Sequence, residues 1–193
     1  MDLRVVDEEA LAEALPRADR KALGVFFTPA ALVGAVFDAI LPHLPVSGSV
    51  AVIDPACGAG AFLTHAAKRL PRARLFGLEL HPDAASWCRA RVRGATVLCG
   101  NALREDWDAL SARIPADAFE LWIGNPPYNG TSALLRDAAA YRRIRALFSG
   151  ALSRGQSLRD DYAFFLLRAA ERISAHPGAI AFVTSATQQD AFL

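Results

Sequence analysis

Four consecutive residues, Asn125-Pro126-Pro127-Tyr128, combine residue types that can act together on a planar amino group. Proline fixes the backbone φ angle at about −65° and has no N–H, so this segment is stiff and rich in hydrogen-bond acceptors. The Asn125 side-chain oxygen and the Pro126 carbonyl oxygen can each accept one hydrogen of the same amino group. An aromatic amine is a poor nucleophile because its lone pair is delocalised, and two acceptors favour a pyramidal nitrogen that can attack a methyl group. By analogy with an oxyanion hole, each acceptor could contribute about 2–4 kcal/mol.

Tyr128 adds a flat surface on which a nucleobase could stack. A base inside a duplex cannot present its amino group to such a pocket, so it would have to be flipped out, and stacking would offset part of the unpairing cost. An Asn-Pro pair alone is typical of an ordinary turn that ends a strand. The full tetrad at a strand end favours the catalytic interpretation.

A second candidate site is the glycine turn that begins at Asp54, with the sequence Asp-Pro-Ala-Cys-Gly-Ala-Gly. Gly58 and Gly60 permit positive φ angles and the close approach of a ligand to the backbone. An acid just before the turn would repel a pyrophosphate but attract an ammonium or sulfonium group. Glu79, at the end of the next expected strand, could accept hydrogen bonds from both hydroxyls of a ribose. The alternative is a tight turn with solvated acids, and the combination of residues favours a site for a cationic nucleoside.

Short apolar runs predict the buried parallel strands that must position these residues: 49–53, 74–78, 96–99 and 119–123. Each run ends at a polar residue, and these residues, 22 to 25 positions apart, are Asp54, Glu79, Asn101 and Asn125. Such spacing is typical of strand–helix–strand units, whose right-handed crossovers bring the strand ends to one edge of an α/β sheet. Ligands bind outside that edge. A fifth strand is expected at 179–184, and helices at 30–41, 60–70, 83–91 and 161–173. Thr28 suits the N-cap of the first helix and Pro29 its first position.

Length and composition are those of one globular domain, with 193 residues, 53% of them hydrophobic, and a net charge of +1. No apolar run approaches the roughly 18–20 residues of a membrane helix, and the acidic N-terminus lacks the layout of a secretory signal, so we expect no membrane partner. The three cysteines are widely spaced and form no CxxC pair, so we expect no metal site. The near-neutral charge does not by itself indicate nucleic acid.

Together these motifs resemble adenine-specific DNA methyltransferases of restriction–modification type, over residues 25–184. The tetrad matches the catalytic motif of that family residue for residue, which implies the catalytic residues Asn125, Pro126, Pro127 and Tyr128. The implied fold is the Rossmann-like α/β fold of class I methyltransferases, a mostly parallel sheet with helices on both faces. The implied reaction transfers a methyl group from S-adenosylmethionine to the 6-amino group of a flipped-out adenine in DNA, as the modification part of a restriction–modification or phage-defence system.

The resemblance also implies where S-adenosylmethionine binds. The segment 26–29 is similar to the upstream cofactor motif of the family, the glycine turn to its glycine motif, and Glu79 to its ribose-binding acid. At the third strand end the family usually has an acid that contacts the cofactor adenine, whereas this chain has Asn101, whose amide oxygen can still accept from the adenine amine. The implied cofactor-binding residues are Phe27, Thr28, Pro29, Asp54, Pro55, Ala56, Cys57, Gly58, Gly60, Phe62, Glu79, Leu80, Asn101 and Ala102.

DNA is the implied partner, and arginines that follow the tetrad are candidates for contacts with its phosphates. Residues 131–160 carry six arginines against two aspartates. A solvated helix face is the alternative interpretation of this charge run. The candidate DNA contacts are Arg136, Arg142, Arg143 and Arg145.

We expect an N-terminal helical extension over 1–24 and a methyltransferase catalytic domain over 25–193. The family fold has seven strands and the sequence predicts five, so we expect the catalytic domain to be incomplete at its C-terminus and the target-recognition domain to be absent. A C-terminal region or a separate chain would supply that domain. The resemblance further implies a cytoplasmic protein of a prokaryote.

Two other functions remain open. The same tetrad occurs in methyltransferases that modify glutamine side chains of release factors, and similar forms modify RNA. The Phe27-Thr28-Pro29 motif and the arginine-bearing spacer favour DNA. The chain could also be a truncated module that binds the cofactor without turnover.

Overall fold

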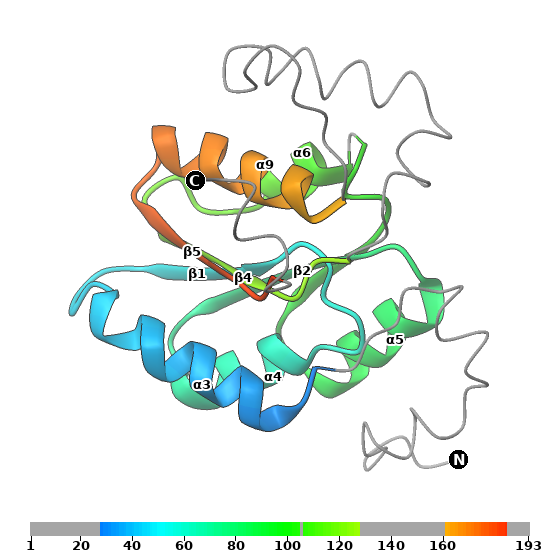
Figure 1. Ribbon diagram of the computed structural model, residues 1–193, viewed down its shortest axis with the longest axis horizontal. Helices are drawn as coiled ribbons and strands as arrows, with labels where there is room; N and C mark the ends of the chain where they lie inside the picture. The colour runs from blue at the N-terminus through cyan, green and yellow to red at the C-terminus, as the bar shows by residue number, and fades with distance from the viewer. Residues whose placement is uncertain (1–27, 105, 128–160, 185–193) are drawn as a thin grey trace.

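A computed structural model describes residues 28–104, 106–127 and 161–184. Its centre is a sheet with the strand order β3-β2-β1-β4-β5 (Figure 1), in which all neighbouring strands are parallel. The strands are β1 (Val50–Asp54), β2 (Arg74–Glu79), β3 (Thr96–Cys99), β4 (Phe119–Gly124) and β5 (Gly178–Phe182). The strand order reverses at β1, because β2 and β3 lie on one side of it and β4 and β5 on the other.

The five predicted strands are confirmed to within two residues at each end. The interiors of the central strands β1 and β4 are buried on both faces, since all but the first residue of each is buried, whereas β5 at the edge is half-buried throughout. Burial on both faces explains why these two strands appear in the sequence as continuous apolar runs rather than as alternating patterns.

Helices cover both faces of the sheet, as expected for an α/β fold. Below the sheet in Figure 1 lie α3 (Ala30–Ile40), α4 (Ala61–Arg69) and α5 (Pro82–Arg91), and above it lie α6 (Asp106–Ser111) and α9 (Asp161–Ala175). A 3-10 turn, η2 (Leu41–His43), follows α3. The sequence did not predict α6, a short helix in which only Trp107 and Leu110 are buried.

The predicted cap of α3 is wrong by one position, although the expected helix range of 30–41 begins at the observed first residue. Pro29 is the N-cap of this helix and Ala30 its first residue, and no side chain caps the helix. Proline has no side-chain acceptor for that task, and Thr28 lies one residue before the position from which a hydroxyl reaches the first free N–H groups. The Thr28 hydroxyl is therefore not committed to the helix end.

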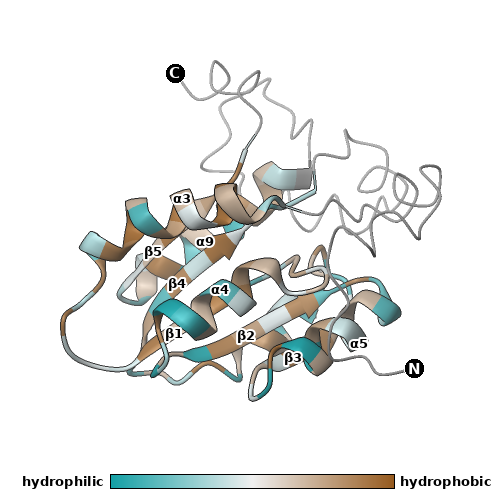
Figure 2. Ribbon diagram, turned by 90° about the horizontal axis from the view of Figure 1, so that it is seen from below, coloured by the Kyte–Doolittle hydropathy of each residue, from teal (hydrophilic) through white to brown (hydrophobic). Residues whose placement is uncertain are grey.

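The lower layer is held together by apolar side chains from α3, α4 and the sheet. Val33 and Phe37 of α3 are 2% and 0% exposed and share one core cluster with Leu63 of α4 and Leu121 of β4. Burial of each such side chain contributes about 1.5–3 kcal/mol to stability. Figure 2, seen from below the sheet, shows hydrophobic residues along the strands. This packing fixes the start of α3, and hence Thr28, relative to the sheet.

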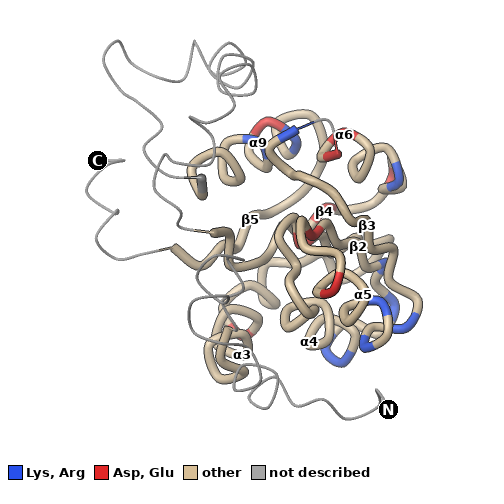
Figure 3. Tube along the Cα trace, turned by 90° about the vertical axis from the view of Figure 1, so that its right-hand side faces the viewer, with Lys and Arg blue, Asp and Glu red and all other residues tan. Residues whose placement is uncertain are grey.

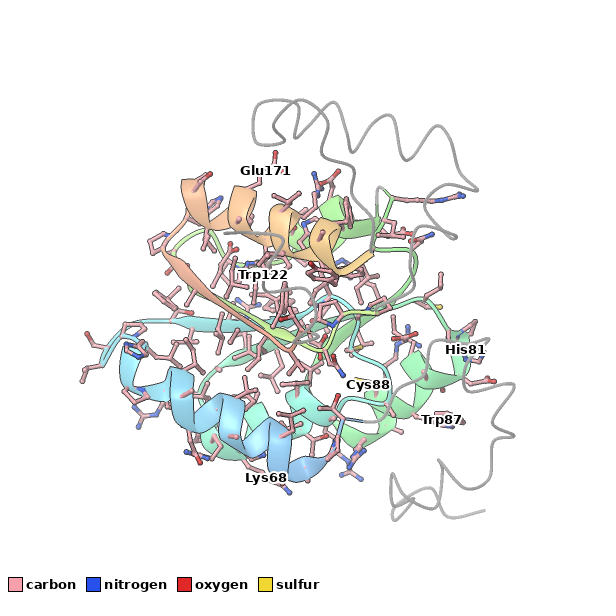
Figure 4. The ribbon with its side chains drawn as sticks, in the orientation of Figure 1. Lys68, His81, Trp87, Cys88, Trp122 and Glu171 are labelled. Carbon is pink, nitrogen blue, oxygen red and sulfur yellow. The ribbon has the colours of Figure 1, made fainter. Side chains whose placement is uncertain are left out.

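In the upper layer, a chain of aromatic and charged groups ties α6 and α9 to β4. Trp122 points from β4 into this layer (Figure 4) and stacks on Trp107 of α6, with ring centroids 4.7 Å apart. The indole N–H of Trp122 donates to Oε2 of Glu120 at 2.9 Å. Arg172 of α9 completes the network with an ion pair of 2.8 Å to Glu120, which is fully buried. Trp107 and Trp122, 2% and 0% exposed, are therefore core residues.

Candidate active site

Asp54 ends β1 at the carboxyl edge of the sheet and is only 1% exposed. Its Oδ1 accepts a hydrogen bond of 3.1 Å from the Ala56 N–H, which anchors the start of the glycine turn. Burial raises the pKa of Asp54 to about 8, and the negative charge of Glu79 contributes in the same direction. A buried acid with this pKa is a favourable site for a cationic ligand, whose positive charge would stabilise the ionised form.

Glu79 ends β2 beside the glycine turn and uses both carboxylate oxygens. Oε2 accepts from the Gly58 N–H at 2.8 Å, and Oε1 accepts from the His81 N–H at 2.8 Å. Each carboxylate oxygen has a further lone pair, so the group can still accept hydrogen bonds from a ligand. Glu79 therefore joins the glycine turn to the start of α5 and presents acceptors at the same edge as Asp54.

Both glycines of the turn have positive φ angles, 53° at Gly58 and 89° at Gly60. A Cβ atom at Gly60 would lie 2.8 Å from Sγ of Cys88, so a side chain there would separate the turn from α5. A Cβ at Gly58 would have no described atom within 4 Å. The backbone of the turn is thus packed tightly against the protein at Gly60 and open to a ligand at Gly58.

Asn125 follows directly after β4 and reaches the upstream motif. Its Nδ2 donates a hydrogen bond of 3.2 Å to Oγ1 of Thr28, a residue 97 positions earlier in the chain. Thr28 is 5% exposed, so this contact is buried at its acceptor end. The structure therefore brings together two motifs that the sequence could associate only through the family resemblance.

Gly124 permits the close approach of the end of β4 to Asp54 at the end of β1. A Cβ atom at this position would lie 2.6 Å from Oδ1 of Asp54 and 3.1 Å from its Cγ. The two strands are hydrogen-bonded neighbours, with Ile53 aligned to Trp122. Only a residue without a side chain allows the backbone before Asn125 to approach the Asp54 carboxylate in this way. Gly124 is not among the predicted site residues, although a glycine directly before the tetrad is a visible signal in the sequence.

Asn101 lies just after β3 in a turn stabilised by its own side chain. Its Oδ1 accepts from the Leu103 N–H at 2.9 Å, and its N–H donates to Oδ2 of Asp106 at 2.7 Å. Asp106, in the first turn of α6, therefore places a carboxylate beside the end of β3, where the family usually has an acid. Asp106 is not among the predicted site residues because α6 is not predicted from the sequence.

The remaining predicted site residues differ in their surroundings. Leu80 is 65% exposed beside Glu79, whereas Cys57 and Phe62 are 4% and 2% exposed and pack in the core between the sheet and its lower helices. Pro55, Ala102 and Pro126 are buried, and Ala56 and Pro127 are half-buried. The residues outside the described part of the chain are Phe27, Tyr128, Arg136, Arg142, Arg143 and Arg145.

Many of the described basic residues gather away from this edge, around the C-terminal ends of α4 and α5 (Figure 3). Because these helices run antiparallel to the strands, their C-terminal ends lie at the opposite edge of the sheet.

Among residues 28–104, 106–127 and 161–184, no three His, Cys, Asp or Glu side chains are grouped so that they could hold a metal ion. In the same ranges, no helix has the length and apolar character needed to cross a membrane.

Residues 8–187, which include every strand end described above, match the family model of the N-6 DNA methylases. The chain belongs to the N-6 DNA methylase family. This membership confirms the family expected from the tetrad and the glycine turn. The parallel sheet covered on both faces likewise confirms the expected Rossmann-like α/β fold.

Known proteins similar to this chain include two named methyltransferases. The Type II methyltransferase M.XamI of Xanthomonas campestris pv. amaranthicola is 30% identical over 187 residues, covering 94% of this chain and 32% of that protein. The release factor glutamine methyltransferase of Streptomyces coelicolor is 36% identical over 78 residues, covering 40% of this chain and 26% of that enzyme. The chain therefore spans about a third of the length of the first relative and about a quarter of the second.

The fold of this N-6 DNA methylase also resembles that of a solved structure, the Thermoplasma acidophilum protein 1320. The two share 16% sequence identity with a TM-score of 0.51, over 90% of this chain and 73% of that one. At this level of identity the likeness concerns the fold alone.

Proposed function

We propose that this chain is the S-adenosylmethionine-binding, catalytic part of a DNA methyltransferase of restriction–modification type that methylates the 6-amino group of adenine. The observation that carries the proposal is the approach of two strand ends, where Gly124 lets the segment that leads into Asn125 lie against the Asp54 carboxylate. A group that attracts a cationic methyl donor and a group that accepts from an amine are thereby neighbours at the point where the strand order reverses. Ligands of open α/β sheets bind at this position.

The residues at this edge fit S-adenosylmethionine. The buried Asp54, with its pKa raised to about 8, suits the positive charges of the methionine amine and the sulfonium. Glu79 presents carboxylate oxygens to the ribose hydroxyls, and the exposed Leu80 offers an apolar surface to the adenine ring. The open space above Gly58 admits the ligand to the backbone of the turn. When bound, this molecule supplies an activated methyl group.

The chain's own contribution to the reaction is to hold the target amine. Oδ1 of Asn125 and the carbonyl oxygen of Pro126 accept its two hydrogens, which localises the nitrogen lone pair. With S-adenosylmethionine bound, that lone pair would form the new N–C bond, the sulfur would keep the electron pair of the broken C–S bond, and one amine proton would pass to solvent. Acceptors positioned for developing positive charge contribute about 2–4 kcal/mol each, by analogy with oxyanion holes.

Methylation of a protein glutamine is the second candidate function, because a release factor glutamine methyltransferase matches part of the chain at 36% identity. A glutamine amide is also a planar amino group with a delocalised lone pair, so the same two acceptors would suit it. Family membership and the match to M.XamI over 94% of the chain favour DNA.

The test incubates the chain with methyl-labelled S-adenosylmethionine and, in separate reactions, unmethylated DNA, RNA and release factor. Label recovered as 6-methyladenine after digestion of the DNA, and lost in Asn125→Ala, would support the proposal. Label in RNA or in a release-factor glutamine would replace it with the corresponding alternative. Calorimetry with S-adenosylmethionine separates the steps, since bound cofactor without label in any substrate would indicate a binding module without turnover.

A further inference from the structure

The hydrogen bond between Asn125 and Thr28 concerns the orientation of an amide. A side-chain amide has a donor end and an acceptor end, and rotation by 180° exchanges them. In the structure the donor end faces Thr28, because Nδ2 of Asn125 donates to Oγ1 of Thr28 at 3.2 Å. The acceptor end, Oδ1, consequently lies at the end of the planar amide that does not donate to Thr28.

Only this orientation suits the target amine of the proposed reaction. The amine presents hydrogens, so it needs an oxygen opposite it, and the reversed amide would place two donors against each other. With Oδ1 given to the substrate, the N–H groups of Asn125 need an acceptor of their own, since a buried donor without a partner is unfavourable. A threonine hydroxyl can accept while keeping its own proton for another acceptor.

The position of Thr28 is set by packing and not by the helix it precedes. Val33 and Phe37 hold α3 in the lower core, so the chain just before the helix is fixed beside the end of β4. No side chain caps α3, whose N-cap is Pro29. The 5% exposure of Thr28 limits competition by water for its hydroxyl.

We propose that Thr28 is a positioning residue that holds the Asn125 amide with its oxygen toward the target amine. This inference rests on the proposed function, and it differs from the implied role of Thr28 as a residue that binds the cofactor. A cofactor-binding role places the effect of its removal on cofactor affinity. A positioning role places the effect on the methyl-transfer step, with the cofactor already bound.

The decisive comparison uses Thr28→Val, which keeps the shape and removes the acceptor, and Thr28→Ser, which restores it. Single-turnover methyl transfer is measured at saturating cofactor and DNA, alongside the dissociation constant of the cofactor. We expect Thr28→Val to slow transfer by about 10- to 100-fold, with cofactor affinity changed by less than about threefold, and Thr28→Ser to recover most of the rate. A saturating rate equal to that of the unchanged chain, with weakened cofactor binding, would overturn the proposal.

Thr64→Val is the matched control for a Thr-to-Val change in the same layer. Thr64 lies in α4, and its hydroxyl has no hydrogen-bond partner within the described ranges. We expect this variant to keep the rate and the cofactor affinity of the unchanged chain. A thermal melt of each variant confirms that a lost rate does not reflect unfolding.

A second readout does not require activity and therefore separates this inference from the proposed function. The side-chain NH₂ signals of Asn125 in a ¹⁵N–¹H spectrum are assigned by their loss in Asn125→Asp. We expect Thr28→Val to shift them and speed their exchange with water, while Thr28→Ser and Thr64→Val leave them in place. Unchanged Asn125 signals in Thr28→Val would refute the positioning role even if no substrate is methylated, and an inactive chain with shifted signals would count against the proposed function alone.

Discussion

A Cβ atom at Gly124 would lie against the buried carboxylate of Asp54, 2.6 Å from its Oδ1. No residue larger than glycine would permit this approach between the ends of β1 and β4. The amide that follows Gly124 and the acid that ends β1 are therefore placed by one steric relationship.

Gly124→Ala should destabilise the chain and weaken its activity more than its stability loss explains. Overpacking a site this tight costs about 1–3 kcal/mol, because Asp54 is buried and cannot move aside into solvent. Urea unfolding measures the free-energy change. Gly34→Ala is the control, because Gly34 lies inside α3, where alanine favours the helix. Its Cβ would make only an ordinary contact of 3.8 Å with His65 of α4. Equal stability of the two alanine variants would contradict the steric role.

The raised pKa of Asp54 predicts that the free energy of unfolding falls as pH rises from about 4 to 8. In this window the folded chain keeps Asp54 protonated while the unfolded chain, with the ordinary pKa of 3.8, has lost the proton. The unfolded state then binds fewer protons, so stability decreases by up to about 1.4 kcal/mol per pH unit and levels off above the folded pKa. Urea unfolding at several pH values tests this, with Asp54→Asn expected to lack the slope. An identical pH dependence in both proteins would rule out the assignment to Asp54.

Binding of S-adenosylmethionine should show the opposite pH dependence. A cationic ligand selects the ionised form of Asp54, so its affinity should increase by up to about tenfold per pH unit below the folded pKa of about 8. Calorimetry between pH 6 and 8.5 measures the dissociation constant, and Asp54→Asn should bind weakly without this dependence. Affinity that is independent of pH in the unchanged chain would mean that the ligand does not contact Asp54.

Glu79→Gln should weaken cofactor binding by about tenfold or more. Both oxygens of Glu79 accept backbone N–H groups, at Gly58 and His81, so an amide must turn its NH₂ toward one of these donors. A broken charge-assisted hydrogen bond costs about 1.5–3 kcal/mol. Asp83→Asn, an exposed carboxylate in the first turn of α5, is the charge-matched control and should change affinity by less than about twofold. Similar losses in both variants would indicate a general charge effect instead.

Arg172→Met should strongly destabilise the chain without touching the candidate site. The change leaves Glu120, fully buried in β4, as an uncompensated charge, which costs about 3–5 kcal/mol. The double variant Glu120→Gln/Arg172→Met should recover much of this stability, because the remaining amide carries no charge. A loss below about 1 kcal/mol in the single variant would show that Glu120 finds another partner or a proton.

The sequence predicted the strands well because continuous apolar runs leave little choice of element. The ends of β1, β2 and β4 fell at the polar residues that now line the candidate site. Prediction from the sequence failed for α6, an element with little apolar content. It also failed where the hydrogen-bond partner of a side chain lies far away in the chain. The hydroxyl of Thr28 was assigned to a helix cap by local preference, whereas the fold directs it to Asn125, 97 residues away. No pattern in the sequence contains that contact.

Adjacent parallel strands are separated by about 4.8 Å, and this spacing is set by backbone hydrogen bonds that are independent of side chains. Since Asp54 ends β1 and Asn125 directly follows the neighbouring β4, this spacing fixes the distance between the two residues. Loops and added domains can change what is presented to Asn125 without altering this length.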